Sequence, residues 1–187
     1  MKVIRLHNNN MALIKKAAKG KRQAQHMLYE THAPKMLSVC RYYIRDIQNA
    51  ESVMLNGFYK AFKNLKTFKN KGSFEGWLRR IMIRESISFL RQENKIEFTF
   101  EEESYPQNSY DNISSNIEVA QIQELIDNLP EGYKIVFIMY AIEGYKHGEI
   151  ADILDITKGT SKSQLYKARQ LLQKEIKKLN TNSYGAK

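Results

Sequence analysis

Apolar residues recur every three or four positions in two long blocks of this chain, and a polar stretch separates the blocks. The 187 residues contain only three prolines, and strict apolar–polar alternation is rare. Helical spacing of apolar residues is typical of helices that bury one face, whereas alternation is typical of strands. The pattern therefore predicts an all-α protein. We expect helices at about 11–28, 32–47, 50–66, 73–91, 117–128, 131–143, 147–153 and 158–178.

The polar stretch falls at residues 96–116. It contains an acidic run at 101–103, Pro106 and several Ser and Asn residues, a composition too polar to bury in a core. We therefore predict two small helical domains, at 11–95 and 117–180, joined by a flexible acidic linker at 96–116.

The charge of the chain changes sign along its length. Residues 1–96 carry a net charge of +14, residues 97–131 carry −9 and residues 132–187 carry +5, for a total of +10. Two basic blocks indicate a polyanionic partner, either nucleic acid or an acidic membrane surface. No apolar run has the length of a membrane span or the character of a signal peptide, so we expect a cytoplasmic protein without membrane insertion.

Residues that could support catalysis or bind a metal do not cluster in the sequence. Cys40, the only cysteine, cannot form an internal disulfide, and it lies on an apolar helix face typical of a core residue. The four histidines share no metal-ligand spacing, and we find no phosphate-binding glycine loop or catalytic carboxylate pair. The sequence therefore predicts no metal, no cofactor and no enzymatic activity.

A helix-turn-helix is predicted near the C-terminus. Residues 149–157 place apolar side chains at helical spacing before a short turn, and Thr157 is a candidate N-cap for the helix that follows at once. In this layout the second helix lies in the DNA major groove. Its apolar stripe would pack on the first helix: Ser161, Leu165, Ala168 and Leu172. Its other face would contact DNA: Lys158, Thr160, Lys162, Ser163, Gln164, Lys167 and Arg169.

The helix predicted at 73–91 combines an aromatic residue with basic ones. Arg84 and Arg91 lie four and eleven positions after Arg80, so the three side chains fall along one stripe of the helix. Trp77 is close to them in the sequence. Aromatic and basic side chains together can stack on unpaired bases and follow a phosphate backbone. Ordinary core packing of the aromatic residues and a solvated arginine face are the alternatives that remain open at this point.

Both blocks resemble the extracytoplasmic-function (ECF) sigma factors, promoter-reading subunits of bacterial RNA polymerase in the sigma-70 family. In the C-terminal block the resemblance rests on residues 129–137, LPEGYKIVF, and 157–169, TKGTSKSQLYKAR. In the N-terminal block it rests on Phe58, Ala61, Phe62, Leu65, Phe68, Ser73, Phe74, Trp77, Leu78, Ile81, Leu90 and Arg91. The resemblance implies a sigma factor that binds core RNA polymerase and directs promoter recognition and DNA melting.

The resemblance also implies a role for each domain. The N-terminal domain would be sigma region 2, which contacts the polymerase clamp and the minus-ten element, and the C-terminal domain would be region 4, whose helix-turn-helix reads the minus-thirty-five element. The implied minus-ten contacts are Lys69, Asn70, Lys71, Ser73, Trp77, Arg79, Arg80 and Arg84. The implied contacts with core polymerase are Glu51, Ser52, Leu55, Asn56 and Tyr59.

Two segments depart from the family pattern. Residues 49–56 read NAESVMLN where the family has Asp-Ala-Glu-Asp-x-x-Gln-Glu, so Glu51 alone keeps its charge. Lys146 and Gly148 stand where the family has a serine cap and an acidic residue, so we expect the first helix of the helix-turn-helix to be less well capped.

The partners implied are core RNA polymerase and promoter DNA. Many family members are also held by an anti-sigma factor, although no residue here requires one. The acidic linker could follow basic channel walls of the polymerase or serve as a solubilising tether. The alternative function is a stand-alone helix-turn-helix regulator that acts without core polymerase.

Overall fold

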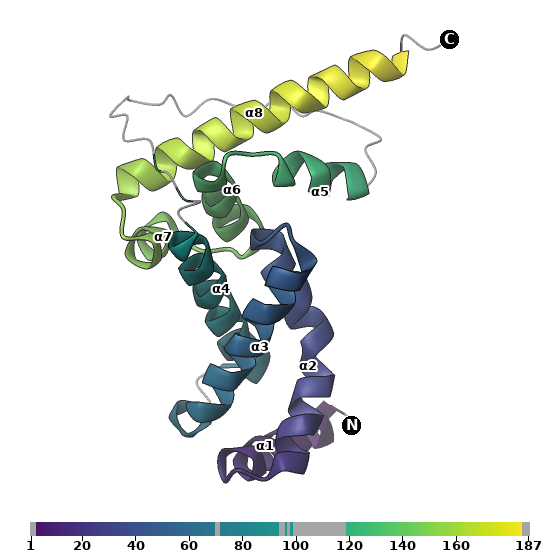
Figure 1. The fold of residues 1–187 in the computed structure, drawn as a ribbon, viewed down its shortest axis with the longest axis vertical. Coiled ribbons are helices and arrows are strands. Elements are labelled where there is room, and N and C mark those ends of the chain that lie inside the picture. The colour runs from purple at the N-terminus through teal and green to yellow at the C-terminus, as the bar shows by residue number, and fades with distance from the viewer. Residues whose placement is uncertain (1–2, 70–71, 94–95, 97, 99–118, 185–187) are drawn as a thin grey trace. The chain divides into compact units, whose positions relative to one another are not determined.

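The computed structural model describes residues 3–69, 72–93, 96, 98 and 119–184, and these residues form helices and short turns without a strand. The predicted all-α class is confirmed. The chain divides into two compact units, Met1–Gln92 and Glu93–Lys187, which are described separately (Figure 1). The predicted linker lies almost entirely outside the described residues.

The N-terminal unit is a helical bundle. Its elements are α1 (Val3–Ala18), α2 (Arg22–Tyr43), α3 (Ile47–Lys63), the 3-10 helix η1 (Leu65–Thr67) and α4 (Phe74–Gln92). Helices α2, α3 and α4 pack on one another, and α1 packs on α2 (Figure 1). The core between them is apolar and includes Leu28, Met36, Val39, Cys40, Tyr43, Phe58, Leu78, Met82, Ile83 and Ile87.

The first helix break was predicted at the wrong place. The chain turns at Gly20, not at 28–32, because Gly20 takes a left-handed conformation with φ +78° that glycine adopts without a steric cost. Helix α2 then runs straight through Pro34. Its buried residues Leu28, His32 and Met36 form one stripe at helical spacing, so continuous packing outweighs the hydrogen bond that Pro34 cannot donate.

The described part of the C-terminal unit contains five helical segments, which lie at or near the four predicted helices. They are α5 (Val119–Asp127), α6 (Glu131–Phe137), the π-helix η2 (Ile138–Ile142), α7 (His147–Leu154) and the long α8 (Lys158–Tyr184). Helices α6 and α7 pack on α8. The buried apolar residues include Ile135, Val136, Ile138, Met139, Ile150, Leu154, Leu165, Ala168 and Leu172.

A buried ion pair joins α5 to α6. Lys134 is fully buried, and its Nζ lies 3.3 Å from Oδ1 of Asp127 and 3.9 Å from Oε1 of Glu131. A buried ammonium is costly unless carboxylates compensate its charge. In the ECF sigma-factor pattern that residues 129–137 resemble, an arginine stands at this position. Lys134 therefore keeps a positive charge at a position that is buried in this chain.

The turn between α7 and α8 is capped as the sequence predicted. The Thr160 N–H donates to Oγ1 of Thr157 at 2.9 Å, which confirms Thr157 as the N-cap of α8. At the start of α7, the Lys146 N–H donates to the Glu149 carboxylate at 2.9 Å. The lysine side chain cannot accept a hydrogen bond, so α7 has one half of a capping box.

Candidate nucleic-acid interface

The tryptophan of α4 is anchored by two phenylalanines. The Trp77 ring centroid lies 5.5 Å from that of Phe68 and 5.7 Å from that of Phe74. Trp77 remains partly exposed, and Arg80 and Arg84 are exposed farther along the same helix. The core-aromatic and base-stacking interpretations therefore do not exclude each other: one part of the indole packs, and another part is accessible for stacking on a base.

The residues before α4 are tied to its first turn. The Gly76 N–H donates to Oγ of Ser73 at 3.0 Å, so Ser73 is the helix cap, and the Trp77 N–H donates to the Ser73 carbonyl at 3.1 Å. Lys69 is exposed and Arg79 is partly exposed. Asn70 and Lys71, which were predicted to contact the minus-ten element, lie outside the described residues.

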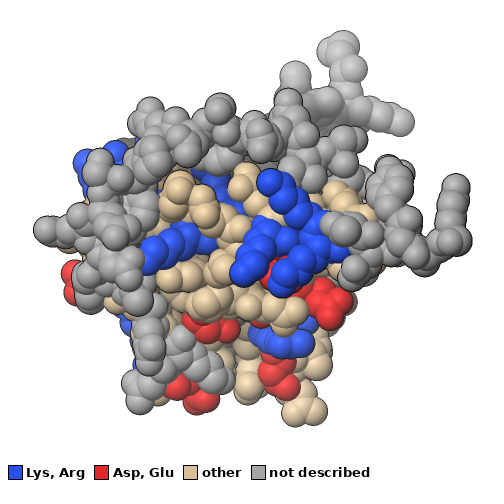
Figure 2. Space-filling model, turned by 90° about the horizontal axis from the view of Figure 1, so that it is seen from above, with Lys and Arg blue, Asp and Glu red and all other residues tan. Residues whose placement is uncertain are grey.

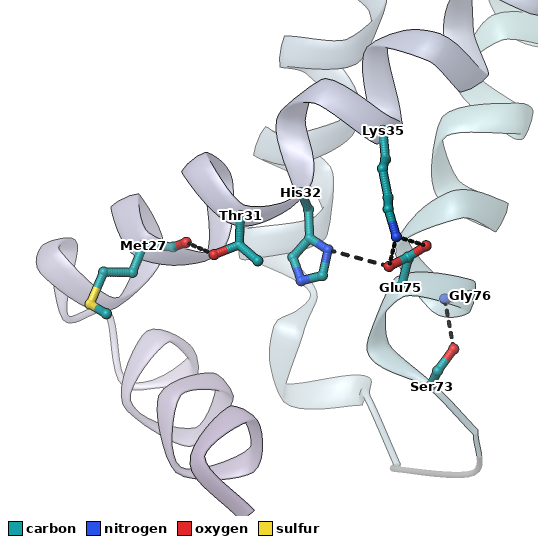
Figure 3. A network of polar contacts seen from close by, with 7 residues as sticks. All are labelled: Met27, Thr31, His32, Lys35, Ser73, Glu75 and Gly76. Carbon is teal, nitrogen blue, oxygen red and sulfur yellow. Dashed lines mark hydrogen bonds and ion pairs between the residues drawn. The ribbon is translucent and has the colours of Figure 1, made fainter. Parts of the chain in front are cut away.

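A polar network joins α2 to the first turn of α4 (Figure 3). The Lys35 Nζ lies 3.2 Å from both carboxylate oxygens of Glu75. The His32 Nδ1 lies 4.0 Å from Glu75, and the His32 ring meets the Phe74 ring edge-on at 5.3 Å. Burial lowers the pKa of His32; the Glu75 carboxylate opposes this shift and the Lys35 ammonium adds to it.

The predicted polymerase-contact residues all lie on one exposed face of α3. Leu55 is 53% exposed and Tyr59 is 65% exposed, although both are large and apolar or aromatic. The remaining three, Glu51, Ser52 and Asn56, are also exposed. The opposite face of α3 is buried through Val53, Met54, Gly57, Phe58 and Ala61.

A groove of about 520 Å³ lies beside this face, between α2 and α3. Its walls are largely apolar, and the carboxylates of Glu30 and Glu51 lie among them. The full lining is Tyr29, Glu30, Ala33, Pro34, Leu37, Glu51, Met54 and Leu55. Because Glu51 and Leu55 belong to both surfaces, the groove and the exposed α3 face are continuous.

Cys40 lies in the core of the N-terminal unit, as predicted. Burial raises the pKa of its thiol to about 11, and the neighbouring Ser86 hydroxyl partly opposes the shift. A thiol with a raised pKa is a poor nucleophile. In the part of the chain that the structure describes, no group of three or more His, Cys, Asp or Glu residues could hold a metal ion.

The predicted DNA-contact residues of α8 differ in accessibility. Lys158 and Lys162 are exposed, Lys167 and Arg169 are half-buried, and the remaining three, Thr160, Ser163 and Gln164, are buried. The Thr160 and Thr157 hydroxyls lie 2.9 Å apart, and the Ser163 hydroxyl donates to the Thr160 carbonyl at 2.9 Å. These two hydroxyls are therefore engaged within the first turns of α8.

An aromatic stack packs α8 against η2 and α7. The Tyr140 ring stacks on that of His147 at 4.6 Å, and the Arg169 guanidinium lies 5.5 Å from the centre of the Tyr140 ring. His147 Nδ1 lies 2.9 Å from the Ser161 hydroxyl. Burial lowers the pKa of His147, and the nearby charges of Lys162 and Arg169 lower it further.

Helix α8 carries several exposed basic side chains. Figure 2 looks down on the side of α8 and shows Lys and Arg side chains grouped near the centre of that face. The exposed lysines of α8 are Lys158, Lys162, Lys174, Lys177 and Lys178. Such a face suits a polyanion. No helix among the described residues is both long enough and apolar enough to span a bilayer.

Two family models match the chain: sigma-70 region 2 over residues 28–96 and sigma-70 region 4 over residues 120–172. The chain is 25% identical to the ECF RNA polymerase sigma-E factor of Haemophilus influenzae, across 91% of this chain and 96% of that protein. It is 26% identical to the ECF RNA polymerase sigma factor SigW of Bacillus subtilis, across 89% and 96%.

Solved structures resemble this fold. The sigma factor RpoE in complex with the anti-sigma factor NepR, from Bartonella quintana, matches with a TM-score of 0.54 and 19% identity, over 81% of this chain and 96% of that one. CnrH in complex with the cytosolic domain of CnrY matches with a TM-score of 0.51 and 19% identity, over 89% and 96%.

Proposed function

The chain belongs to the sigma-70 family and is a sigma factor of the ECF type, and from this premise we propose how its described surfaces divide the work of transcription initiation. The N-terminal unit binds core RNA polymerase and the minus-ten element. The C-terminal unit binds the minus-thirty-five element. Sigma factors are non-catalytic initiation factors, and this one acts in the cytoplasm, where core polymerase works.

The observation that carries the proposal is the outer side of α4. Trp77 packs against Phe68 and Phe74 and stays partly exposed, with Arg80 and Arg84 exposed farther along the helix. A fixed aromatic ring beside two guanidinium groups suits an unpaired base and the phosphates that flank it. This side of α4, with Lys69, Asn70, Lys71, Ser73 and Arg79, binds the melted minus-ten strand.

The exposed face of α3 is the surface proposed for core polymerase. Exposed Leu and Tyr side chains on a helix that is otherwise well packed are typical of a protein interface. Leu55 and Tyr59 would provide buried contact area, and Glu51 would provide the remaining charge. Because the usual acidic residues are missing, we propose that apolar contacts supply most of the affinity of this surface.

The first turns of α8 would bind the minus-thirty-five duplex. Lys158 and Lys162 are accessible to phosphates, which supply affinity but little sequence information. Sequence preference is assigned to Gln164, whose amide can pair with a base edge once its buried side chain turns outward on binding. The half-buried Lys167 and Arg169 complete the contact surface, and the buried Thr160 and Ser163 support it from within the first turns of α8.

An anti-sigma factor is included among the proposed partners. A solved relative with the same fold, RpoE, is bound to the anti-sigma factor NepR. A stand-alone regulator is less well supported, because it would need only the helix-turn-helix, whereas the region 2 model matches residues 28–96 as well.

Multi-round transcription tests the function. Core polymerase from the source organism is supplied with genomic promoter fragments, with the full chain or without it, and a Trp77→Ala chain serves as the site control. We expect transcripts that depend on the chain, share upstream elements and are weakened by the substitution. Duplex binding without any chain-dependent transcript would favour the stand-alone regulator.

A further inference from the structure

The start of α4 is tethered by a single carboxylate. Glu75 lies in the first helical turn and pairs with Lys35 of α2 through both of its oxygens, at 3.2 Å each. The Glu75 side chain is 39% exposed and that of Lys35 is 66% exposed, so the pair is only partly shielded from water. A carboxylate in the first turn is also favoured by the helix dipole. Glu75 therefore links the first turn of α4 to α2.

The same turn leads directly to the tryptophan. His32 of α2 lies behind Glu75, is 5% exposed and packs edge-on against Phe74, which in turn packs against Trp77. Within the described residues neither ring nitrogen of His32 has a hydrogen-bond partner. The ring of His32 therefore acts here mainly through packing, and Lys35 provides the polar tether.

We propose that Glu75, held by Lys35 and backed by His32, is a positioning residue that sets Trp77 for stacking on unpaired bases. This inference rests on the proposed function of α4. If the first turn of α4 shifts, Phe74 moves with it, and the indole of Trp77 loses the orientation in which it can stack on a base. Stacking tolerates base identity but depends on the alignment of the two planes, so a loosened first turn should slow promoter opening more than it weakens polymerase binding.

Helix α4 has a second tether that provides a matched control. Lys60 of α3 pairs with Glu85, with a shortest distance of 2.7 Å. Glu85 lies ten positions after Glu75 on the same helix, about 15 Å farther along its axis. Both pairs join α4 to a neighbouring helix, but only the Lys35–Glu75 pair lies at the turn that carries Phe74 and leads to Trp77.

The experiment compares E75Q, E85Q and the charge-swapped double variant K35E/E75K with the unmodified chain. Each full-length chain is assembled with core polymerase on a promoter that the unmodified chain opens. Opening is followed through the permanganate reactivity of unpaired thymines. Binding to core polymerase and the thermal midpoint are measured in parallel. Trp77 is the only tryptophan, so the emission of the free chain reports directly on its packing.

We expect E75Q to open the promoter roughly three- to five-fold more slowly, which is the change that corresponds to the loss of one partly shielded ion pair. Its Trp77 emission should shift, while its binding to core polymerase stays unchanged. E85Q should open the promoter at the normal rate, even if its thermal midpoint falls as far as that of E75Q. The swapped variant should recover most of the lost rate.

Three results would overturn the inference: equal opening rates for E75Q and E85Q, unchanged Trp77 emission in E75Q, or a swapped variant as slow as E75Q. If the unmodified chain opens no promoter with core polymerase, the proposed function of α4 fails instead. The two failures are therefore distinguishable.

Discussion

The predicted contact residues of α3 and those of α8 differ in solvent exposure. All five predicted polymerase contacts on α3 are exposed, including Leu55 and Tyr59, whose large side chains are of types that are often buried. On α8, three of the seven predicted DNA contacts are buried. The α8 set was predicted from the argument that a helix buries one stripe and leaves the other free, whereas the α3 set was implied by the resemblance to ECF sigma factors.

For two of the three buried residues of α8, Thr160 and Ser163, the difference lies in hydroxyls that bond within their own turn; this does not explain the burial of the longer Gln164. The residues assigned to α3 follow its period, and the buried residues occupy the opposite side. Near the start of α8 the hydroxyls are short and can bond within their own turn, as Thr160 does with Thr157 and Ser163 with the Thr160 carbonyl. A short polar side chain can therefore be buried without a cost in unsatisfied groups, and polarity alone does not indicate exposure.

The largest expected effect is on the α3 side of this comparison. L55D places a carboxylate at the centre of the surface proposed for core polymerase. We expect affinity for core polymerase to fall by about 30-fold or more, the change typical of a lost interface hot spot. Titration of labelled chain with core polymerase measures it.

The control for L55D is S88D, which adds the same charge at an exposed position of α4. S88D should bind core polymerase normally, and both variants should keep the unfolding midpoint of the unmodified chain. If L55D binds core polymerase with normal affinity, the exposed face of α3 is not part of the polymerase interface. The exposure of Leu55 and Tyr59 would then need another explanation.

A second, smaller effect tests the α8 side. Q164A should change preference at one or two upstream positions by about ten-fold, near 1.4 kcal/mol, whereas K162A should weaken all sequences alike because phosphate contacts carry no sequence information. Binding of holoenzyme to a set of single-base promoter variants separates the two patterns. If Q164A lowers stability and leaves preference unchanged, Gln164 is a packing residue and the two helices differ in function as well as in exposure.

How far the sequence predicts the fold depends on where the determining contacts lie. Helical spacing predicted the class, four of the five C-terminal segments and the Thr157 cap, because these depend on residues a few positions apart. The break before α2 was misplaced because the chain turns at Gly20, in a left-handed conformation, and the buried stripe through Leu28, His32 and Met36 then continues without interruption. The π-helix η2 was included in one continuous helix, since its altered hydrogen bonding has no periodic signal.

The site was predictable only in part for the same reason. Trp77, Arg80 and Arg84 share one helix, so their alignment follows from spacing. The Lys35–Glu75 pair joins positions forty residues apart, and nothing in the sequence indicates that α2 passes the first turn of α4. Lys134 also looked like an ordinary basic residue, although it is fully buried beside Asp127.

The helix caps allow one comparison between the two units, with smaller expected effects on stability. T157A removes the hydroxyl that accepts from the Thr160 N–H and contacts the Thr160 hydroxyl, and S73A removes one cap bond at α4. We expect each to lower the free energy of unfolding by about 1 kcal/mol, with T157A the more costly. Urea denaturation measures the change, and T157S, which keeps the hydroxyl, should match the unmodified chain. A smaller loss for T157A than for S73A would mean that Thr160 finds another partner.

The smallest expected effect is on the pH dependence of stability, through the two histidines His32 and His147. Burial lowers the pKa of His32 and His147 below the ordinary value of 6.5. As the pH falls below about 6.5, the unfolded chain therefore binds more protons than the folded chain, and the free energy of unfolding decreases. H32F keeps an aromatic ring against Phe74 but cannot take up a proton, so its stability should fall less steeply with acid. Urea denaturation at several pH values between about 7.5 and 5.5 measures the slope.

Ser88, an exposed residue of α4, provides the control for this prediction. S88A should show the same pH slope as the unmodified chain, because the substitution changes no group that takes up a proton. The slope that remains in H32F should belong largely to His147, and a second substitution, H147F, should reduce it further. If H32F keeps the full slope, the proton taken up on unfolding does not come from His32. Its position behind Glu75 would then affect Trp77 through packing alone.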